Sequence, residues 1–124
     1  MLGGFLTATQ YVQAQRLRRI LTRKVDALFE TVDVLLTAII PGAAPVLKET
    51  DDGPWRRQQP LASVFNVTGH PCMAQPCGFS KNGLPLSAQL VGRHFDEATV
   101  LRAGYAYEQE AGWINKRPAL ASLS

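Results

Sequence analysis

The stretch of residues 65–93, FNVTGHPCMAQPCGFSKNGLPLSAQLVGR, constrains the fold of this chain more than any other part. It predicts two short strands, one of small residues flanked by prolines at 72–76 and one that is apolar and uninterrupted at 84–91. The loop between them ends in Asn82-Gly83, a pair that suits positive φ and is typical of hairpin turns. Because this loop is longer than two residues, we expect a bulged or wide hairpin.

The second strand carries no charged face. Its side chains divide into Leu84, Leu86, Ala88 and Leu90 on one side and Pro85, Ser87, Gln89 and Val91 on the other. A strand with this pattern is typically covered on both sides. The sequence therefore predicts an α/β protein in which helices pack on a sheet, rather than a small sandwich.

A long amphipathic helix is predicted before the hairpin, from a cap at Thr7 or Thr9 to about Glu30. Its apolar positions have the three-four spacing of a one-sided helix: Leu17, Ile20, Leu21, Val25, Leu28 and Phe29. Basic residues occupy much of the rest, namely Arg16, Arg18, Arg19, Arg23 and Lys24. Because no aromatic side chains are interleaved with these charges, a solvated outer face is favoured over a nucleic-acid interface.

A buried strand is predicted at 32–40, with Asp33 at its start in a structural role. The following segment, 41–60, is rich in turn-forming residues and is predicted to be a loop. It carries Trp55 beside two arginines, and packing of this side chain onto the body of the protein is favoured over ligand contact. A short helix is then predicted at 61–67, ending at a cap on Gly69.

The last helix is predicted to begin at an Asp96 N-cap and to end at Gly112. Phe95 and Val100 are placed to form a hydrophobic staple across the cap. The inner face of this helix is predicted to comprise Val100, Leu101, Gly104 and Tyr105, with Gly104 allowing close approach to the sheet.

His70 and two cysteines are the candidates for chemistry. A histidine titrates near neutral pH, but the sequence places no nucleophile beside His70, so a loop or capping role is favoured over catalysis. Cys72 and Cys77 are expected to be reduced thiols, and pairing of either with His70 for catalysis is disfavoured. Their spacing matches no common zinc pattern, and only His70 and His94 could complete one, so neither a metal nor another cofactor is expected.

Several motifs in order resemble the C-terminal region of the amidase signature family. They are N-x-T-G-x-P at 66–71, P-C-G-F at 76–79, G-L-P-x-x-x-Q-L-V-G-R at 83–93 and F-D-E at 95–97. The segments YVQAQR at 11–16, DVLLT at 33–37 and AYEQE at 106–110 are similar to the elements on either side, so the resemblance covers about residues 11–118. It implies a partial α/β/α layer with a mixed sheet and flanking helices. Residues 1–124 would then be one C-terminal fragment of an amidase-like domain, with 1–10 and 115–124 frayed at its ends.

The resemblance also implies hydrolysis of amide bonds, which in this family uses a serine, a second serine in a cis peptide and a lysine within a Gly/Ser-rich stretch. The serines present, Ser63, Ser80, Ser87, Ser122 and Ser124, do not lie in such a stretch. The lysines, Lys24, Lys48, Lys81 and Lys116, do not match the lysine motif. No catalytic residue is therefore assigned, and the substrate-binding residues are unknown.

The remaining expectations concern environment and partners. Neither a signal peptide nor a long apolar segment is evident, so a soluble, cytoplasmic protein is expected. The net charge of +3 is too mild to indicate nucleic acid or membrane as a partner. The first interpretation is an amidase-like hydrolase part that is inactive alone, and the alternative is a non-catalytic interaction module. Either would associate with a second copy or with an N-terminal amidase fragment.

Overall fold

The computed structural model describes residues 3–45 and 61–116, which form three α-helices, three strands and two short 3₁₀ turns. In chain order these are η1 (Gly3–Phe5), α1 (Ala8–Leu28), β1 (Val34–Ala38), α2 (Ser63–Thr68), β2 (Cys72–Phe79), β3 (Pro85–Gly92), α3 (Glu97–Ala111) and η4 (Trp113–Asn115). The predicted α/β class is confirmed. The predicted loop residues 46–60, including Trp55, and the tail from 117 lie outside the described residues.

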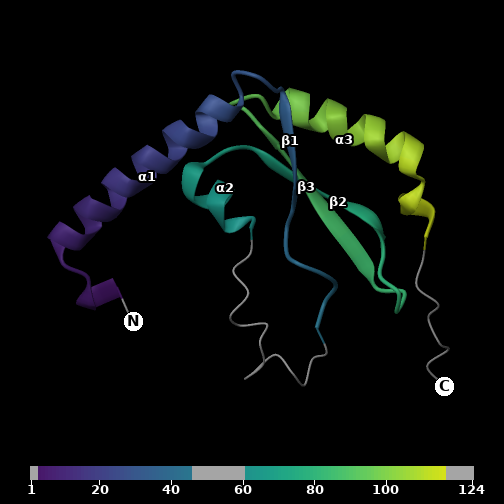
Figure 1. The fold of residues 1–124 in the computed structure, drawn as a ribbon, viewed down its shortest axis with the longest axis horizontal. Helices are drawn as coiled ribbons and strands as arrows, with labels where there is room; N and C mark the ends of the chain where they lie inside the picture. Colours follow the sequence, from purple (N-terminus) through teal and green to yellow (C-terminus); the bar gives the residue numbers. More distant parts are fainter. Residues whose placement is uncertain (1–2, 46–60, 117–124) are drawn as a thin grey trace.

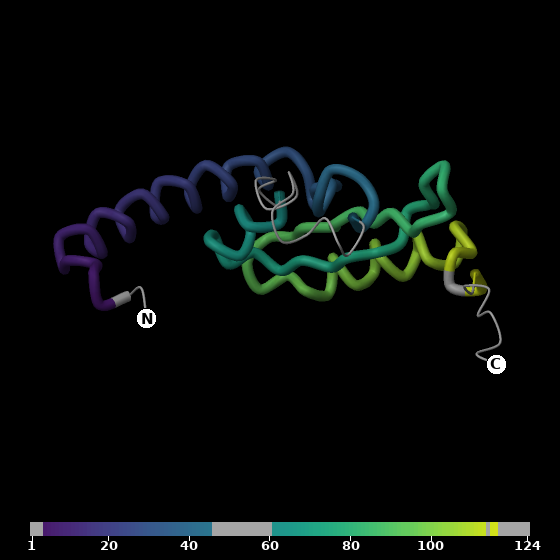
Figure 2. The backbone as a smooth tube through the Cα atoms, turned by 90° about the horizontal axis from the view of Figure 1, so that it is seen from below, coloured from purple at the N-terminus to yellow at the C-terminus, as the bar shows by residue number. Residues whose placement is uncertain are grey.

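The strands form one sheet in the order β1-β3-β2, with β3 in the centre. Both pairings are antiparallel, so the described part of the chain does not include the parallel pairs of the expected mixed sheet. Figure 1 shows β2 and β3 as a long hairpin, with β1 on the other side of β3. Figure 2 shows α3 lying along one side of the sheet, while α1 extends beyond its end.

The predicted hairpin is present and is bulged. Pro76 pairs with Ser87 and Gly78 pairs with Leu86, so Cys77 is an extra residue that has no partner on β3. This bulge lets β2 continue to Phe79, beyond the predicted end at residue 76, because the strand can bend after the proline.

The turn is closed by hydrogen bonds at Ser80. Its backbone N–H donates to the Leu84 carbonyl over 2.8 Å, and its carbonyl accepts from the Gly83 N–H over 2.9 Å. The Ser80 hydroxyl also accepts the Leu84 N–H at 3.1 Å. Gly83 has φ +75°, as its place in the turn suggested, whereas Asn82 has a negative φ.

The ends of the helices follow the predicted caps. Thr7 and Gln10 form a reciprocal capping box at the start of α1, and the Asp96 carboxylate accepts the Thr99 N–H at the start of α3. Glycines in the left-handed conformation end two of the helices: Gly69 stops α2 and Gly112 stops α3.

The predicted staple between Phe95 and Val100 is wrong. Phe95 has φ +62° in the tight turn before α3, where the Asp96 N–H donates to the Arg93 carbonyl, and its side chain is 95% exposed. Val100 instead packs against Gly92 on β3, at a place where any Cβ would collide with it. Leu101 and Tyr105 are exposed too, so Val100 and Gly104 form the buried face of α3.

Gly104 brings α3 close to β2, as predicted. A Cβ at this position would lie 2.6 Å from the Met73 sulfur. On the other side of the sheet the core is small and lies at one end, where Val25 of α1 and the C-cap residue Phe29 meet Phe65 of α2 and Val91 of β3. Within residues 3–45 and 61–116, the central strand is therefore covered on both sides only near Val91.

Candidate functional site

His70 lies at the packed end of the molecule, directly after the left-handed turn at Gly69 that stops α2. Its side chain is fully buried, with Nε2 3.1 Å from Asp26 Oδ1 and Nδ1 2.9 Å from Thr68 Oγ1. The ring also stacks on Phe29 at a centroid distance of 5.3 Å. Burial, followed by the nearby His94, lowers the pKa of His70 from 6.5, and Asp26 partly offsets this effect. His70 is therefore a neutral, packed side chain at neutral pH.

Neither cysteine is placed as a nucleophile for this histidine. The Cys72 thiol donates to the backbone carbonyl of His70 at 3.3 Å and not to its ring. Burial raises the pKa of Cys72, which lowers the fraction present as the reactive thiolate. Cys77 is exposed at the bulge, and both thiols are free, as predicted.

The described serines stand on different elements. Ser63 begins α2, Ser80 uses its hydroxyl in the hairpin turn, and Ser87 is exposed on β3. Lys24 lies in α1 and Lys81 in the turn, while Lys48 and Ser122 are outside the described residues. This distribution gives no reason to assign a catalytic role to any described serine.

Arg93 has a structural role that the sequence did not indicate. Its guanidinium donates to the Phe29 carbonyl through Nε at 3.1 Å and Nη2 at 2.9 Å, and it pairs with Asp33 at 3.0 Å. The last carbonyls of a helix have no partner within the helix, so Arg93 completes the C-terminus of α1. Asp33 has the structural role predicted for it.

The basic face of α1 also makes a structural contact. Arg18 Nε donates to the Val67 carbonyl at the end of α2 over 2.6 Å. This bond spans 49 positions of sequence and ties the middle of α1 to α2. Arg18, which was predicted to lie on a solvated outer face, therefore also joins the two helices.

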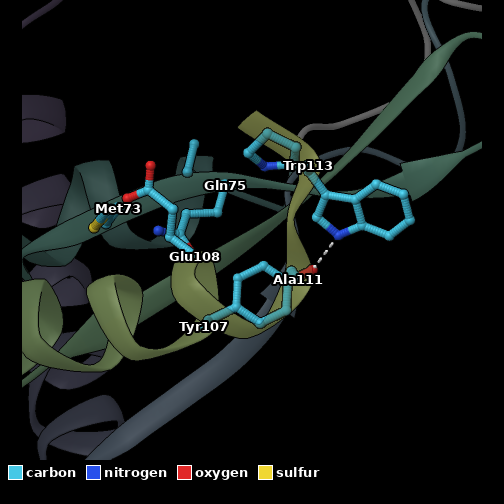
Figure 3. Close-up of a pocket in the computed structure, with 8 residues that line it drawn as sticks. Met73, Gln75, Tyr107, Glu108, Ala111 and Trp113 are labelled. Carbon is cyan, nitrogen blue, oxygen red and sulfur yellow. Dashed lines mark hydrogen bonds between the residues drawn. The ribbon is translucent and has the colours of Figure 1, made fainter. Parts of the chain in front are cut away.

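A cavity in the described part of the chain lies between β2 and the end of α3 (Figure 3). It has a volume of about 300 Å³ and is lined by Met73, Ala74, Gln75, Pro76, Tyr107, Glu108, Ala111 and Trp113. At its rim the Trp113 indole N–H donates to the Tyr107 hydroxyl at 3.0 Å, shown as the dashed line in Figure 3. Phe79 packs edge-on against Trp113 and holds the indole in place.

Gln75 is the polar anchor of this cavity. Its side-chain NH₂ donates to the Gly104 carbonyl at 2.9 Å, but its Oε1 is buried and has no hydrogen-bond partner among the described residues. A buried acceptor without a donor is costly, so it favours a ligand or segment that supplies an N–H or O–H. The described residues of the lining include no serine, cysteine or lysine, so they do not supply the serine and lysine that the family uses for amide hydrolysis.

Comparison with known proteins agrees with the motifs. The family model described as Amidase matches residues 1–101. The chain is 41% identical over 125 residues to the A subunit of the glutamyl-tRNA(Gln) amidotransferase from Brevibacillus brevis, covering 95% of this chain and 26% of that protein. It is 41% identical over 127 residues to an amidase of Pseudomonas putida, covering 96% of this chain and 27% of that protein.

The fold agrees as well. The crystal structure of the A subunit of the glutamyl-tRNA(Gln) amidotransferase from Thermotoga maritima matches with a TM-score of 0.74 at 28% identity, over 82% of this chain and 23% of that one. The chain belongs to the amidase signature family. It spans about a quarter of the length of the curated relatives it matches. No helix in the described residues is both long and apolar enough to cross a membrane.

Proposed function

We propose that this chain is the C-terminal part of an amide-bond hydrolase and that it hydrolyses no amide by itself. The observation that carries the proposal is the match of residues 1–101 to the amidase family by a chain that spans about a quarter of its relatives. In this role the hairpin and β1 would extend a larger sheet, and α3 would cover part of it. The catalytic groups would come from outside the chain. The free thiols support a cytoplasmic setting.

The chemistry of the described residues supports the second half of the proposal. Amide hydrolysis needs a nucleophile, a group that takes its proton, and donors to the oxyanion. Ser80 already accepts the Leu84 N–H in a turn, and Cys72 is directed at a backbone carbonyl. The names of the relatives divide between part of an amidotransferase and an amidase, so the proposal stays at the class of amide bonds.

The test is an assay of the purified chain on simple aliphatic and aryl amides. We expect hydrolysis no faster than in buffer alone. The matched controls are Ser63→Ala, Ser80→Ala and Ser87→Ala, which together cover the described serines. Turnover above background that one of these substitutions abolishes would overturn the proposal.

We further propose that the exposed apolar face of α1 is covered by another protein surface. Leu17 and Ile20 lie on this face and are each more than half exposed, and β1 and β2 both have a free edge in the described sheet. Such edges and apolar faces promote association. In the cell the cover would be an N-terminal amidase fragment, and in the purified chain it would be a second copy.

Light scattering tests this association. We expect the purified chain to run as a homo-oligomer at high concentration and the double variant Leu17→Glu, Ile20→Glu to run as a monomer. Lys24→Glu changes a charge on the same helix without altering the apolar face and should leave the oligomer intact. A monomeric wild-type chain at high concentration would contradict the proposal for the isolated chain.

A further inference from the structure

Three metal-ligating side chains meet at the packed end of the molecule. Asp26 comes from the last turns of α1, His70 from the loop after α2, and His94 from the turn between β3 and α3. One ligand atom from each lies within 4.8 Å of the other two. Asp26 Oδ1 is 3.1 Å from His70 Nε2 and 3.6 Å from His94 Nε2.

We propose that Asp26, His70 and His94 form a binding site for a divalent transition-metal ion, with Zn²⁺ as the reference ion. Zinc binds imidazole nitrogen and carboxylate oxygen at about 2.0–2.2 Å, so two donors on one ion lie roughly 3–3.5 Å apart. The two separations from Asp26 are already close to that range. Two imidazoles with one carboxylate suit zinc and iron(II) rather than calcium or magnesium, which prefer oxygen donors.

The surroundings of His70 fit a metal ligand. A ligating histidine normally donates its other ring N–H to a fixed acceptor. Here Nδ1 lies 2.9 Å from Thr68 Oγ1, and that hydroxyl in turn lies 3.5 Å from the Phe65 carbonyl. With a metal on Nε2, Nδ1–H donates to Thr68 and the Thr68 hydroxyl donates to Phe65. Without metal, Nε2–H donates to Asp26 and the Thr68 hydroxyl donates to Nδ1. Metal binding would therefore change the tautomer of His70, while both ring nitrogens keep a partner.

The site is open on one side. A cavity of about 280 Å³ is lined by Asp26, Phe29, Glu30, Arg93 and His94. The side chains of Asp26 and His94 are 48% and 32% exposed, which leaves a path for the ion and room for water ligands. The positive charge of Arg93 is engaged by the Phe29 carbonyl and by Asp33. The ion would join three segments that are far apart in sequence, and so it would stabilise the fold rather than perform the amide chemistry.

The experiment titrates Zn²⁺ into the chain carrying Cys72→Ser and Cys77→Ser, because exposed thiols bind zinc themselves. We expect one ion per chain and a rise in thermal stability on loading. His94→Ala should weaken binding by more than the 10–100-fold typical of losing an outer partner, and Thr68→Val should weaken it by about that amount. Asp33→Asn, a nearby carboxylate outside the cluster, should leave binding unchanged.

Nitrogen NMR of His70 supplies a second readout, because loading should move its proton from Nε2 to Nδ1. This change is expected in the wild-type cluster and not in His94→Ala. Circular dichroism checks that each variant is folded. Equal zinc affinity in the cysteine-free chain and its His94→Ala variant would overturn the proposal, as would the absence of one-to-one binding.

Discussion

The two halves of α1 share one amphipathic pattern but have different surroundings. Near the C-terminal end, Val25 and Phe29 are 6% and 4% exposed, and they pack against α2 and β3. Nearer the N-terminus, Leu17 and Ile20 are 57% and 52% exposed and belong to no described core cluster. The periodicity of a helix identifies which face is apolar, but it does not identify what covers that face. The association proposed above would supply this cover, and about three quarters of the relatives' length lies outside the match.

Shortening a buried side chain at the packed end of α1 should have the largest effect on stability. Phe29→Ala removes a buried aromatic ring that touches the core and His70, and we expect a loss of about 3–5 kcal/mol in the free energy of unfolding. Leu17→Ala, on the exposed half of the same helix, should change it by only about 0.5 kcal/mol. Urea denaturation of dilute protein measures both. Similar losses in the two variants would show that the halves of α1 are not energetically distinct.

The hairpin turn should respond less strongly, and through its backbone. Gly83 has φ +75° and open space around it, so Gly83→Val introduces strain without a packing clash. The expected loss is about 1–3 kcal/mol for a strained backbone position. Lys81→Ala in the same turn should stay within about 0.5 kcal/mol of wild type. If urea midpoints for Gly83→Val and wild type coincide, the turn does not impose the left-handed conformation assigned to Gly83.

The smallest expected effect is the dependence of the free energy of unfolding on pH that arises from His70. Because the pKa of His70 is lowered from 6.5 in the folded chain, the unfolded chain binds more protons between the two pKa values. The contribution of His70 to stability is therefore fully present above pH 6.5 and is lost as the pH falls through 6.5 toward the lowered pKa. Asp26 acts to raise this pKa, so Asp26→Asn should steepen the fall.

Urea midpoints measured from pH 8 to pH 5 with a chelator present check this dependence. His70→Asn removes the titrating ring and should flatten the profile. A wild-type midpoint that stays level or rises on acidification, with no difference from His70→Asn, would contradict the role given to His70.

Local features of the fold were predictable because each depends on a few adjacent residues. The caps at Thr7, Asp96, Gly69 and Gly112 follow from side-chain acceptors and glycines at helix ends. The hairpin followed from an uninterrupted apolar run and the Asn82-Gly83 pair in the turn. The position of the bulge at Cys77 was not predictable, because the register that creates it depends on the facing strand.

Contacts between distant segments could not be predicted in the same way. Phe95 was placed in a staple because its spacing to Val100 is correct, but the turn before α3 directs it to solvent. Arg93 reaches carbonyls 64 and 61 positions away, and His70 meets Asp26 across 44 positions. Of the three clustered ligands, the sequence indicated only His70 and His94. Asp26 lies among the polar positions of a long helix, where nothing local distinguishes it.

Hydrogen exchange measured at several protein concentrations tests the contrast between the two halves of α1 most directly. Amides that are protected by packing within the chain exchange slowly at every concentration, whereas amides protected by association exchange faster on dilution. We predict that the amides of β3 and of residues 22–28 exchange at a rate that does not depend on concentration, while those of residues 11–20 exchange faster as the chain is diluted. Slow, concentration-independent exchange in residues 11–20, equal to that of β3, would contradict the account, because the first half of α1 would then be held by the chain itself.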